Sequence, residues 1–269
     1  MPRLDKAVTG GVVAIAGEQR SVGLEVHDAV QAALIVLENG GTSALAERTF
    51  NNVLAGFQKS GVAAIWRIDY VSVSGALENG HAASLVTPVG PIGLNLTRVL
   101  AASDLGERVA QKPLAPPTLA GEIERIRTLP TPHNRWVMAL AAAAAGGFFA
   151  KTAAGDSAAL GICPAGAGTG QLVRSLLQTA GLNRASATFL SAFCSGLVAT
   201  VGIRLGLTLT TAATLLGSVI YTVPGLLLIN GFLDLTTEGH LVVGTERLLH
   251  ALYLSFLVTI AIAAVDALL

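Results

Sequence analysis

The sequence predicts a membrane protein in which an N-terminal cytoplasmic α+β domain precedes an all-α bundle of five transmembrane helices. The chain has 269 residues, of which 52% are hydrophobic and 13% are charged, whereas an ordinary soluble domain carries about 25% charged residues. The charge is also unevenly placed, because residues 1–135 hold 24 of the 34 charged side chains. We therefore expect a soluble domain over residues 20–130 and a membrane domain over residues 135–269.

Charged residues divide the second half into apolar runs of the length that a membrane helix needs. The runs contain between 15 and 29 uncharged residues, and a spanning helix needs roughly 20. Lysine and arginine at the ends of a short run can extend their charged groups to the interface. The predicted spans cover about residues 135–152, 156–174, 184–204, 208–230 and 247–268.

The distribution of lysine and arginine at the span ends predicts the orientation. The segment after Arg3 and Lys6 is short and diluted by glycine, so we do not interpret it as a signal peptide. With the N-terminus inside, only Lys151 and Arg204 flank the spans on the outer side. The inner side holds Arg125, Arg127, Arg135, Arg174, Arg184 and Arg247. Five spans then place the C-terminus outside.

The first half shows helix and strand patterns in turn. Residues 21–41 and 42–61 have helical apolar spacing, with Ser21 and Ser43 as expected caps and Gly40-Gly41 and Gly61 as stops. Two strands are predicted over 63–77 and 81–89, joined by the hairpin signal Glu78-Asn79-Gly80. Helices are expected again over 96–111 and about 118–128.

The sequence offers no catalytic constellation, which argues against an enzyme with its site in the first half. No nucleophile elbow, dinucleotide fingerprint or zinc pattern is present, and Cys163 and Cys194 lack metal-ligand spacing. A formal net charge of zero gives no basic surface for nucleic acid. We therefore expect no cofactor, no metal and no nucleic-acid partner. Glu47, Arg48 and Glu246 are interpreted as solvated charges.

Two features inside the spans concern helix geometry. Gly166-x-x-x-Gly170 predicts close helix contact, because no Gly-Lys-Ser/Thr follows to make it a phosphate loop. Pro224-Gly225 interrupts a long apolar run and is followed by Asn230 and Asp234. Either this break lines a transport pathway, as broken helices do in transporters, or it is a kink followed by a helix end at Asn230-Gly231.

Two groups of residues resemble a known family over roughly residues 22–268. In the first half these are Gly40, Ser43, Glu47 and Asn95, although Gly41-Thr42 stands where the family has Ala-Glu. In the second half, "VPGLLLINGFLDL" and "GHLVVGTERL" match a signature at Pro224, Gly225, Asn230, Asp234, Gly239, His240, Gly244 and Arg247. The spacing from Asp234 to Gly239 is one residue longer than in the family. The chain resembles the threonine/serine exporter family, and most closely its YjjP-type branch, in which the transporter is split into two chains.

The resemblance implies export of small polar metabolites across the bacterial cytoplasmic membrane. Threonine and serine, or dicarboxylates such as succinate, are the implied substrates, and a second small membrane subunit and an oligomer are the implied partners. Pro224, Gly225, Asn230, Asp234, Gly239 and Arg247 are the candidate transport path. Arg247 either binds a substrate carboxylate or forms a structural salt bridge with Asp234.

Two alternatives to this role stay open. His240 and His250 are candidates for a proton relay, although for His250 a helix-packing role is the simpler interpretation. For the whole chain, the main alternative is a regulatory or scaffolding membrane subunit whose partner carries the path. A membrane-anchored enzyme is the third and least favoured class.

Overall fold

The computed structural model describes residues 23–76, 82–131 and 133–269, and these divide into two compact units. Unit 1 holds the residues up to Pro130 together with Phe232–Glu246, and unit 2 holds Thr131–Gly231 together with Arg247–Leu269. Two helices, α9 (Gly225–Leu235) and α10 (Leu241–Leu268), therefore contribute one end to each unit.

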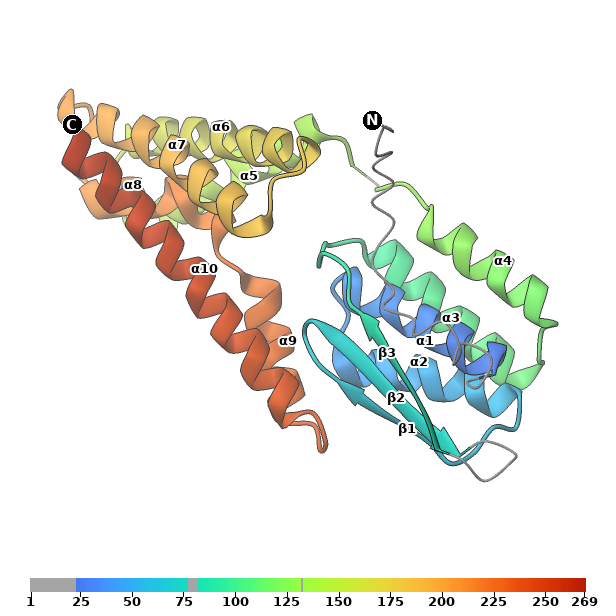
Figure 1. Ribbon diagram of the computed structural model, residues 1–269. Coiled ribbons are helices and arrows are strands. Elements are labelled where there is room, and N and C mark those ends of the chain that lie inside the picture. The colour runs from blue at the N-terminus through green and yellow to red at the C-terminus, as the bar shows by residue number, and fades with distance from the viewer. Residues whose placement is uncertain (1–22, 77–81, 132) are drawn as a thin grey trace, which may run out of the picture. The chain divides into compact units, whose positions relative to one another are not determined.

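Unit 1 combines helices with a small antiparallel sheet of strand order β1-β2-β3 (Figure 1). Its elements before Pro130 are α1 (Leu24–Glu38), α2 (Ser43–Gly56), β1 (Val62–Trp66), β2 (Tyr70–Ala76), β3 (Ala82–Pro88), α3 (Leu96–Gln111) and α4 (Pro116–Arg127). Val71 and Val73, two positions apart on β2, are both buried, as expected for one face of a strand. They join a core in which Phe50 and Trp66 meet edge to face, with ring centroids 5.7 Å apart.

The helix predictions for unit 1 are confirmed, with local corrections. The stretch 63–77 holds two strands, because the chain turns at residues 67–69 and Arg67 N–H donates to the carbonyl of Tyr70. Helix α2 is capped by Thr42, whose side chain accepts from the N–H of Leu45, and Ser43 is its first residue. Helix α2 also ends at Gly56, before Gly61, because Gln58 takes a left-handed φ of 54°. The predicted cap Ser21 and the turn Glu78-Asn79-Gly80 lie outside the described residues.

The regular secondary structure described in unit 2 is all helical. Its elements are α5 (Arg135–Thr152), α6 (Ala159–Thr179), α7 (Arg184–Arg204), α8 (Thr211–Val219), the 3-10 helix η1 (Ile220–Thr222), the first part of α9 and most of α10. Helices α5 to α8 pack against one another, and their contact surfaces are built from alanine, glycine, serine and threonine. Val258 and Ala261 of α10 pack with Ala192 of α7 and Val219 of α8 in a separate apolar cluster.

Two described helices, α7 and α10, are long and apolar enough to cross a membrane. The pair Thr211–Thr222 and Gly225–Leu235, bent by 68° at its break, makes a third if it is a single span. Helices α5 and α6 occupy the first two predicted spans but do not reach the same level of apolarity. In α6, residues 165–171 are alanine, glycine, threonine and glutamine, which are less apolar than the leucine and valine of α10. The number of five spans stays a prediction.

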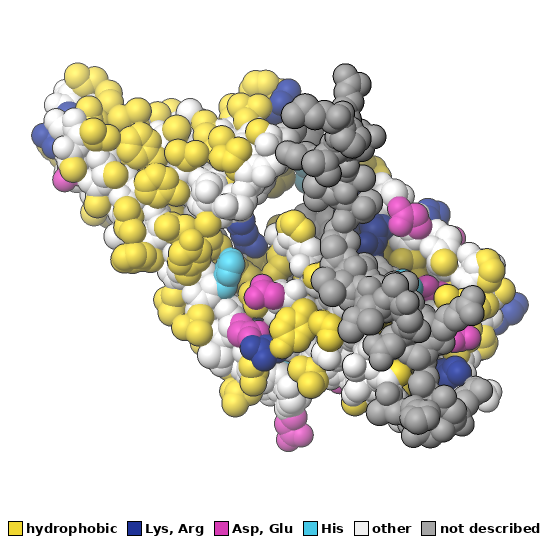
Figure 2. All heavy atoms as spheres, viewed as in Figure 1, with side chains coloured by type: hydrophobic (Ala, Val, Ile, Leu, Met, Phe, Trp, Pro, Cys, Tyr) yellow, Lys and Arg dark blue, Asp and Glu magenta, His cyan; other side chains and the backbone are white. Residues whose placement is uncertain are grey.

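The surface of unit 2 is strongly apolar. Phe148, Leu209, Leu252 and Phe256 are each at least 60% exposed, and hydrophobic side chains cover most of the visible face of the α5–α10 region (Figure 2). Monomeric soluble proteins rarely expose contiguous apolar patches of this kind. Together with the long apolar helices, this surface is consistent with a membrane protein.

Candidate functional site

The Pro224-Gly225 pair breaks a helical segment of unit 2. Helix α8 ends at Val219 and continues as η1 to Thr222, Pro224 lies in the break, and α9 begins at Gly225. Proline suits this position because it has no N–H to donate and cannot continue the preceding helix. Its carbonyl accepts the first α9 hydrogen bond, from Leu228 N–H at 3.1 Å. The 68° bend therefore has an identifiable local cause.

Helix α9 does not end at Asn230-Gly231, which corrects one of the two alternatives for this segment. It continues to Leu235, so that Asn230 and Asp234 lie one turn apart on the same helix face. Both are buried, with 7% and 0% of their surface exposed. A buried carboxylate needs hydrogen-bond donors to offset its lost hydration, and the structure supplies them.

The donors for Asp234 come from the first residue of α2. Ser43 N–H donates to Asp234 Oδ1 at 3.1 Å, and Ser43 Oγ donates to Oδ2 at 3.0 Å. Thr42 already serves as the α2 cap, so Ser43 N–H is one of the first-turn donors that have no partner within the helix. The helix dipole adds to the attraction, because its N-terminal end favours negative charge. Asp234 therefore fixes the end of α9 to the start of α2 within unit 1.

A second contact joins α2 to the segment between α9 and α10. Gly239 has a φ of 82°, a left-handed conformation that favours glycine, and it turns the chain into His240. His240 is 3% exposed, and its Nε2 lies 3.3 Å from Glu47 Oε2. Ser43 and Glu47 are four residues apart, so one face of α2 carries both contacts. The interpretation of Glu47 as a purely solvated charge is therefore wrong.

A third contact uses the turn between β1 and β2. Glu246 accepts from Arg67 Nε at 2.6 Å and from Ile68 N–H at 3.1 Å. The hydrogen bond to Glu246 raises the pKa of Arg67 above its ordinary value. Glu246 is thus an ion-pair partner, which corrects its interpretation as a solvated residue. We call residues 232–246, which make these three contacts to the N-terminal part of unit 1, the docking segment.

The remaining predicted site residues lie in unit 2. Arg247 follows the docking segment directly and is 4% exposed. The ring of His250 meets that of Tyr253 edge to face, with centroids 6.1 Å apart. Gly166 and Gly170 lie where α6 meets α7, α8 and η1. A Cβ at Gly166 would come within 2.8 Å of Ser218, and one at Gly170 would overlap Ser195 and Tyr221.

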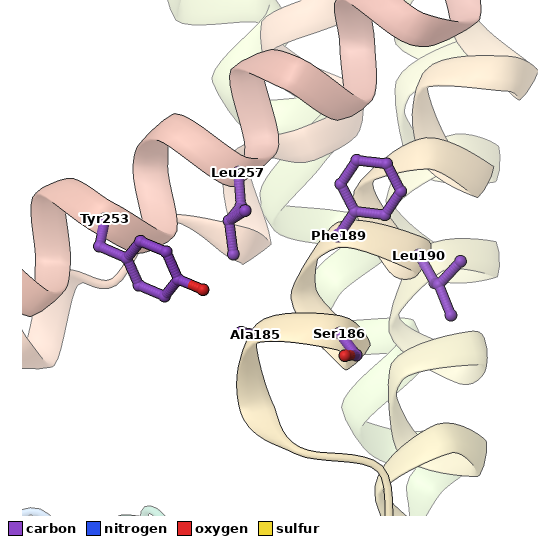
Figure 3. A pocket seen from close by; sticks show the side chains of 6 residues that line it. All are labelled: Ala185, Ser186, Phe189, Leu190, Tyr253 and Leu257. Atoms are coloured by element: carbon purple, nitrogen blue, oxygen red, sulfur yellow. The ribbon is translucent and has the colours of Figure 1, made fainter.

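Unit 2 also has a shallow apolar pocket between α7 and α10, with a volume of about 360 Å³ (Figure 3). Its lining is Ala185, Ser186, Phe189, Leu190, Tyr253 and Leu257. Only the hydroxyls of Ser186 and Tyr253 are polar side-chain groups in that set. None of the predicted site residues lines this pocket.

The sequence did not predict which residues the docking segment contacts. The family pattern identified Ser43, Glu47, Asp234 and His240, but no local signal joined residues almost two hundred positions apart. Arg67 had no signal at all, because a single arginine after a strand is common. Among the described residues, no group of three or more histidine, cysteine, aspartate or glutamate side chains could hold a metal ion.

Comparison with known proteins identifies the family. The family model described as "Putative threonine/serine exporter" matches residues 28–269. No curated protein and no solved structure matches the chain. The match covers both units, including the docking segment and the break at Pro224. The chain therefore belongs to the threonine/serine exporter family, a family of membrane transport proteins.

Proposed function

We propose that this chain is a subunit of a secondary transporter that exports small polar metabolites from the bacterial cytoplasm. Threonine and serine, or dicarboxylates such as succinate, are the proposed cargo. A second small membrane subunit completes the transporter, and the assembly is oligomeric. Membership of the threonine/serine exporter family supports a role in transport.

One observation carries the proposal: a helix broken at Pro224 leads directly to buried polar side chains at Asn230 and Asp234. Broken helices with polar groups nearby are a recurrent way to form transporter sites. Buried ionisable residues near a membrane are costly and are functional candidates by default. We assign the path to Pro224, Gly225, Asn230, Asp234, Gly239 and Arg247. His240 and His250 are the proposed proton relay positions, because imidazole changes charge near physiological pH.

The docking segment supports the proposed orientation. Its contacts to Ser43, Glu47 and Arg67 need residues 232–246 and the N-terminal part of unit 1 to lie on the same side of the membrane. An even number of crossings between Pro130 and Phe232 meets that requirement. The four spans predicted for this interval are even in number. We therefore propose a cytoplasmic N-terminal domain and, after a fifth span, an external C-terminus.

The same contacts favour one alternative function. Asp234, His240 and Glu246 all contact residues in the N-terminal part of unit 1, so these polar residues also hold the docking segment in place. A regulatory or scaffolding subunit, whose partner carries the path, needs such contacts and does not need a cargo site. The two functions predict different effects of substituting the buried charges. Transport should fall if these residues line the path and should survive if the partner carries it.

Efflux of labelled succinate, threonine and serine from bacterial cells separates the two functions. Cells carry the chain with or without the second subunit, and with Asp234→Asn or Arg247→Gln. The matched control is Asp266→Asn, which removes an exposed carboxylate paired with Arg204. Efflux that needs both subunits and falls at least about tenfold in either variant, equivalent to roughly 1.4 kcal/mol, supports the path. Efflux that survives both substitutions supports the regulatory subunit, and the absence of efflux for every substrate rules out this cargo.

A further inference from the structure

Arg174 of α6 is a half-buried cation inside unit 2. Among the described residues, it forms no ion pair with a carboxylate and no side-chain hydrogen bond. The groups that interact with it electrostatically are the phenol of Tyr221 and the guanidinium of Arg184. Two like charges close together in a partly desolvated place repel each other. An arginine in such a setting normally has an anionic partner.

Hydroxyl groups gather on the helix faces next to Arg174. Tyr221 OH and Ser195 Oγ lie 3.0 Å apart, and Ser195 Oγ also donates to the carbonyl of Gly166 at 3.0 Å. The phenol interacts with the hydroxyl of Ser191 as well. Because Gly170 has no side chain, the hydroxyls of Ser195 and Tyr221 pack directly against the α6 backbone there. Gly170 lies one helical turn before Arg174. The cluster therefore combines a guanidinium with several neutral donors.

Thr188 supplies a second and independent observation. It is 1% exposed, and its hydroxyl has no hydrogen-bond partner within the described residues. A buried polar group without a partner costs stability and needs an explanation. Thr188 lies on the same face of α7 as Ser191 and Ser195, at positions spaced by three and four residues. Its hydroxyl is therefore placed on the side of α7 that faces α6.

We propose that Arg174, Thr188 and Tyr221 form a binding site for the carboxylate of a small metabolite. A guanidinium fork matches a carboxylate in shape and charge, and the hydroxyls can donate to its remaining lone pairs. A bound anion relieves the repulsion between Arg174 and Arg184 and gives the Thr188 hydroxyl a partner. We call this set of residues the α6–α7 anion site.

This inference deepens the proposed export function and rests on it only for the identification of the anion as cargo. In the proposed orientation, the end of α6 and the start of α7 face the cytoplasm. A metabolite leaving the cell would then meet the α6–α7 anion site early. Threonine, serine and succinate all carry a carboxylate, so the site selects for that group and leaves the rest of the molecule unspecified.

Binding to the purified full-length chain in nanodiscs of zwitterionic lipid tests the site. Labelled succinate and threonine are titrated, and succinamide serves as the uncharged analogue. Arg174→Gln is expected to weaken carboxylate binding about tenfold or more, Arg174→Lys less, and Thr188→Val several-fold. Arg204→Gln, at the exposed opposite end of α7, is the matched control and should bind as the wild type does. Unchanged binding in Arg174→Gln, or equal binding of succinamide, overturns the inference.

Nanodiscs containing phosphatidylglycerol distinguish a lipid headgroup from a metabolite. Displacement of bound succinate only by other carboxylates supports the α6–α7 anion site. Retention of phosphatidylglycerol that depends on Arg174 and resists carboxylates overturns it, as does the absence of any carboxylate binding. Thermal unfolding of each variant shows whether it is folded. Thr188→Val removes a single hydroxyl and keeps the shape of the side chain, so this variant tests the site even if Arg174→Gln is unstable.

Export by the same variants separates this inference from the proposed function. If the wild type binds succinate at the α6–α7 anion site but no cells export any substrate, the site stands and the proposed export function fails. If export of a carboxylate is unchanged in Arg174→Gln, the export function stands and the site fails.

Discussion

Ser43 and Asp234 are 191 positions apart in the chain, and the N–H and hydroxyl of Ser43 donate separately to the two carboxylate oxygens of Asp234. The carboxylate thereby occupies the N-terminal end of α2, where unsatisfied N–H groups and the helix dipole favour an anion. Ser43 belongs to the part of the family pattern in the first half of the chain, and Asp234 belongs to the part in the second half. The pair explains why a serine and an aspartate suit these two positions in this chain.

The first prediction concerns the strength of this pair. Ser43→Ala keeps the backbone N–H but loses the hydroxyl donor, so the free energy of unfolding should fall by about 1–2 kcal/mol. Asp234→Ala leaves both donors without their acceptor and should cost about 2–3 kcal/mol. Denaturant unfolding of the purified chain, monitored through tryptophan fluorescence, measures both.

Ser175→Ala is the matched control for that measurement. Ser175 donates to the carbonyl of Gln171 in its own helix, so its loss should change the free energy of unfolding by less than about 0.5 kcal/mol. The double variant Ser43→Ala/Asp234→Ala tests the coupling directly. If the two single effects simply add, the two residues do not interact in solution.

The second prediction compares the side-chain contacts of two adjacent residues of α2, Glu47 and Arg48. Glu47 lies 3.3 Å from the buried His240, whereas Arg48 pairs with Glu107 where both side chains are exposed. A double-mutant cycle with Glu47→Gln and His240→Gln should give a coupling energy of about 0.5–1 kcal/mol, and the cycle with Arg48→Gln and Glu107→Gln should give close to zero. If the two coupling energies are equal, the contact between Glu47 and His240 adds no more stability than an exposed surface pair does.

The sequence predicted the parts of the fold that depend on local patterns. The bounds of α3, α5 and α7 follow directly from helical spacing and from the charges at their ends. The bend at Pro224 was predicted because proline lacks an N–H and cannot continue a helix. Boundaries failed where a single residue decided them, as at Gln58, whose left-handed φ ends α2 early.

The contacts of the docking segment were not predicted from the sequence. Ser43, Glu47, Asp234 and His240 all occur in the family pattern, yet their pairing depends on tertiary contacts that no local spacing encodes. Arg67 and Glu246 were missed for the same reason. A buried carboxylate needs hydrogen-bond donors, and the first turn of a helix offers N–H groups that have no partner within the helix. Nothing in the local sequence indicates which of the helix starts supplies them.

The third prediction uses the buried carboxylate of Asp28 in α1. Burial raises its pKa above the ordinary value of 3.8, so the ionised form is less favourable in the folded than in the unfolded chain. Stability from this residue is therefore present below pH 3.8 and is lost as the pH rises through the higher folded pKa. Asp28→Asn should raise the free energy of unfolding at pH 7.5, and the gain should shrink towards pH 4. A gain that is independent of pH would assign the effect to shape instead of charge.

The last prediction compares Gly170, which close helix packing needs, with Gly225, which belongs to the proposed transport path. Gly170→Ala should cost about 1–3 kcal/mol in thermal unfolding, because its Cβ overlaps Ser195 and Tyr221 and the helices must move apart. Gly225→Ala meets nothing within 4 Å and lies at the start of α9, so stability should change by less than about 0.5 kcal/mol or rise slightly. A fall in efflux in a stable Gly225→Ala variant would then support the proposed path. A loss of stability as large as that of Gly170→Ala would instead place Gly225 among the glycines needed for close helix contact.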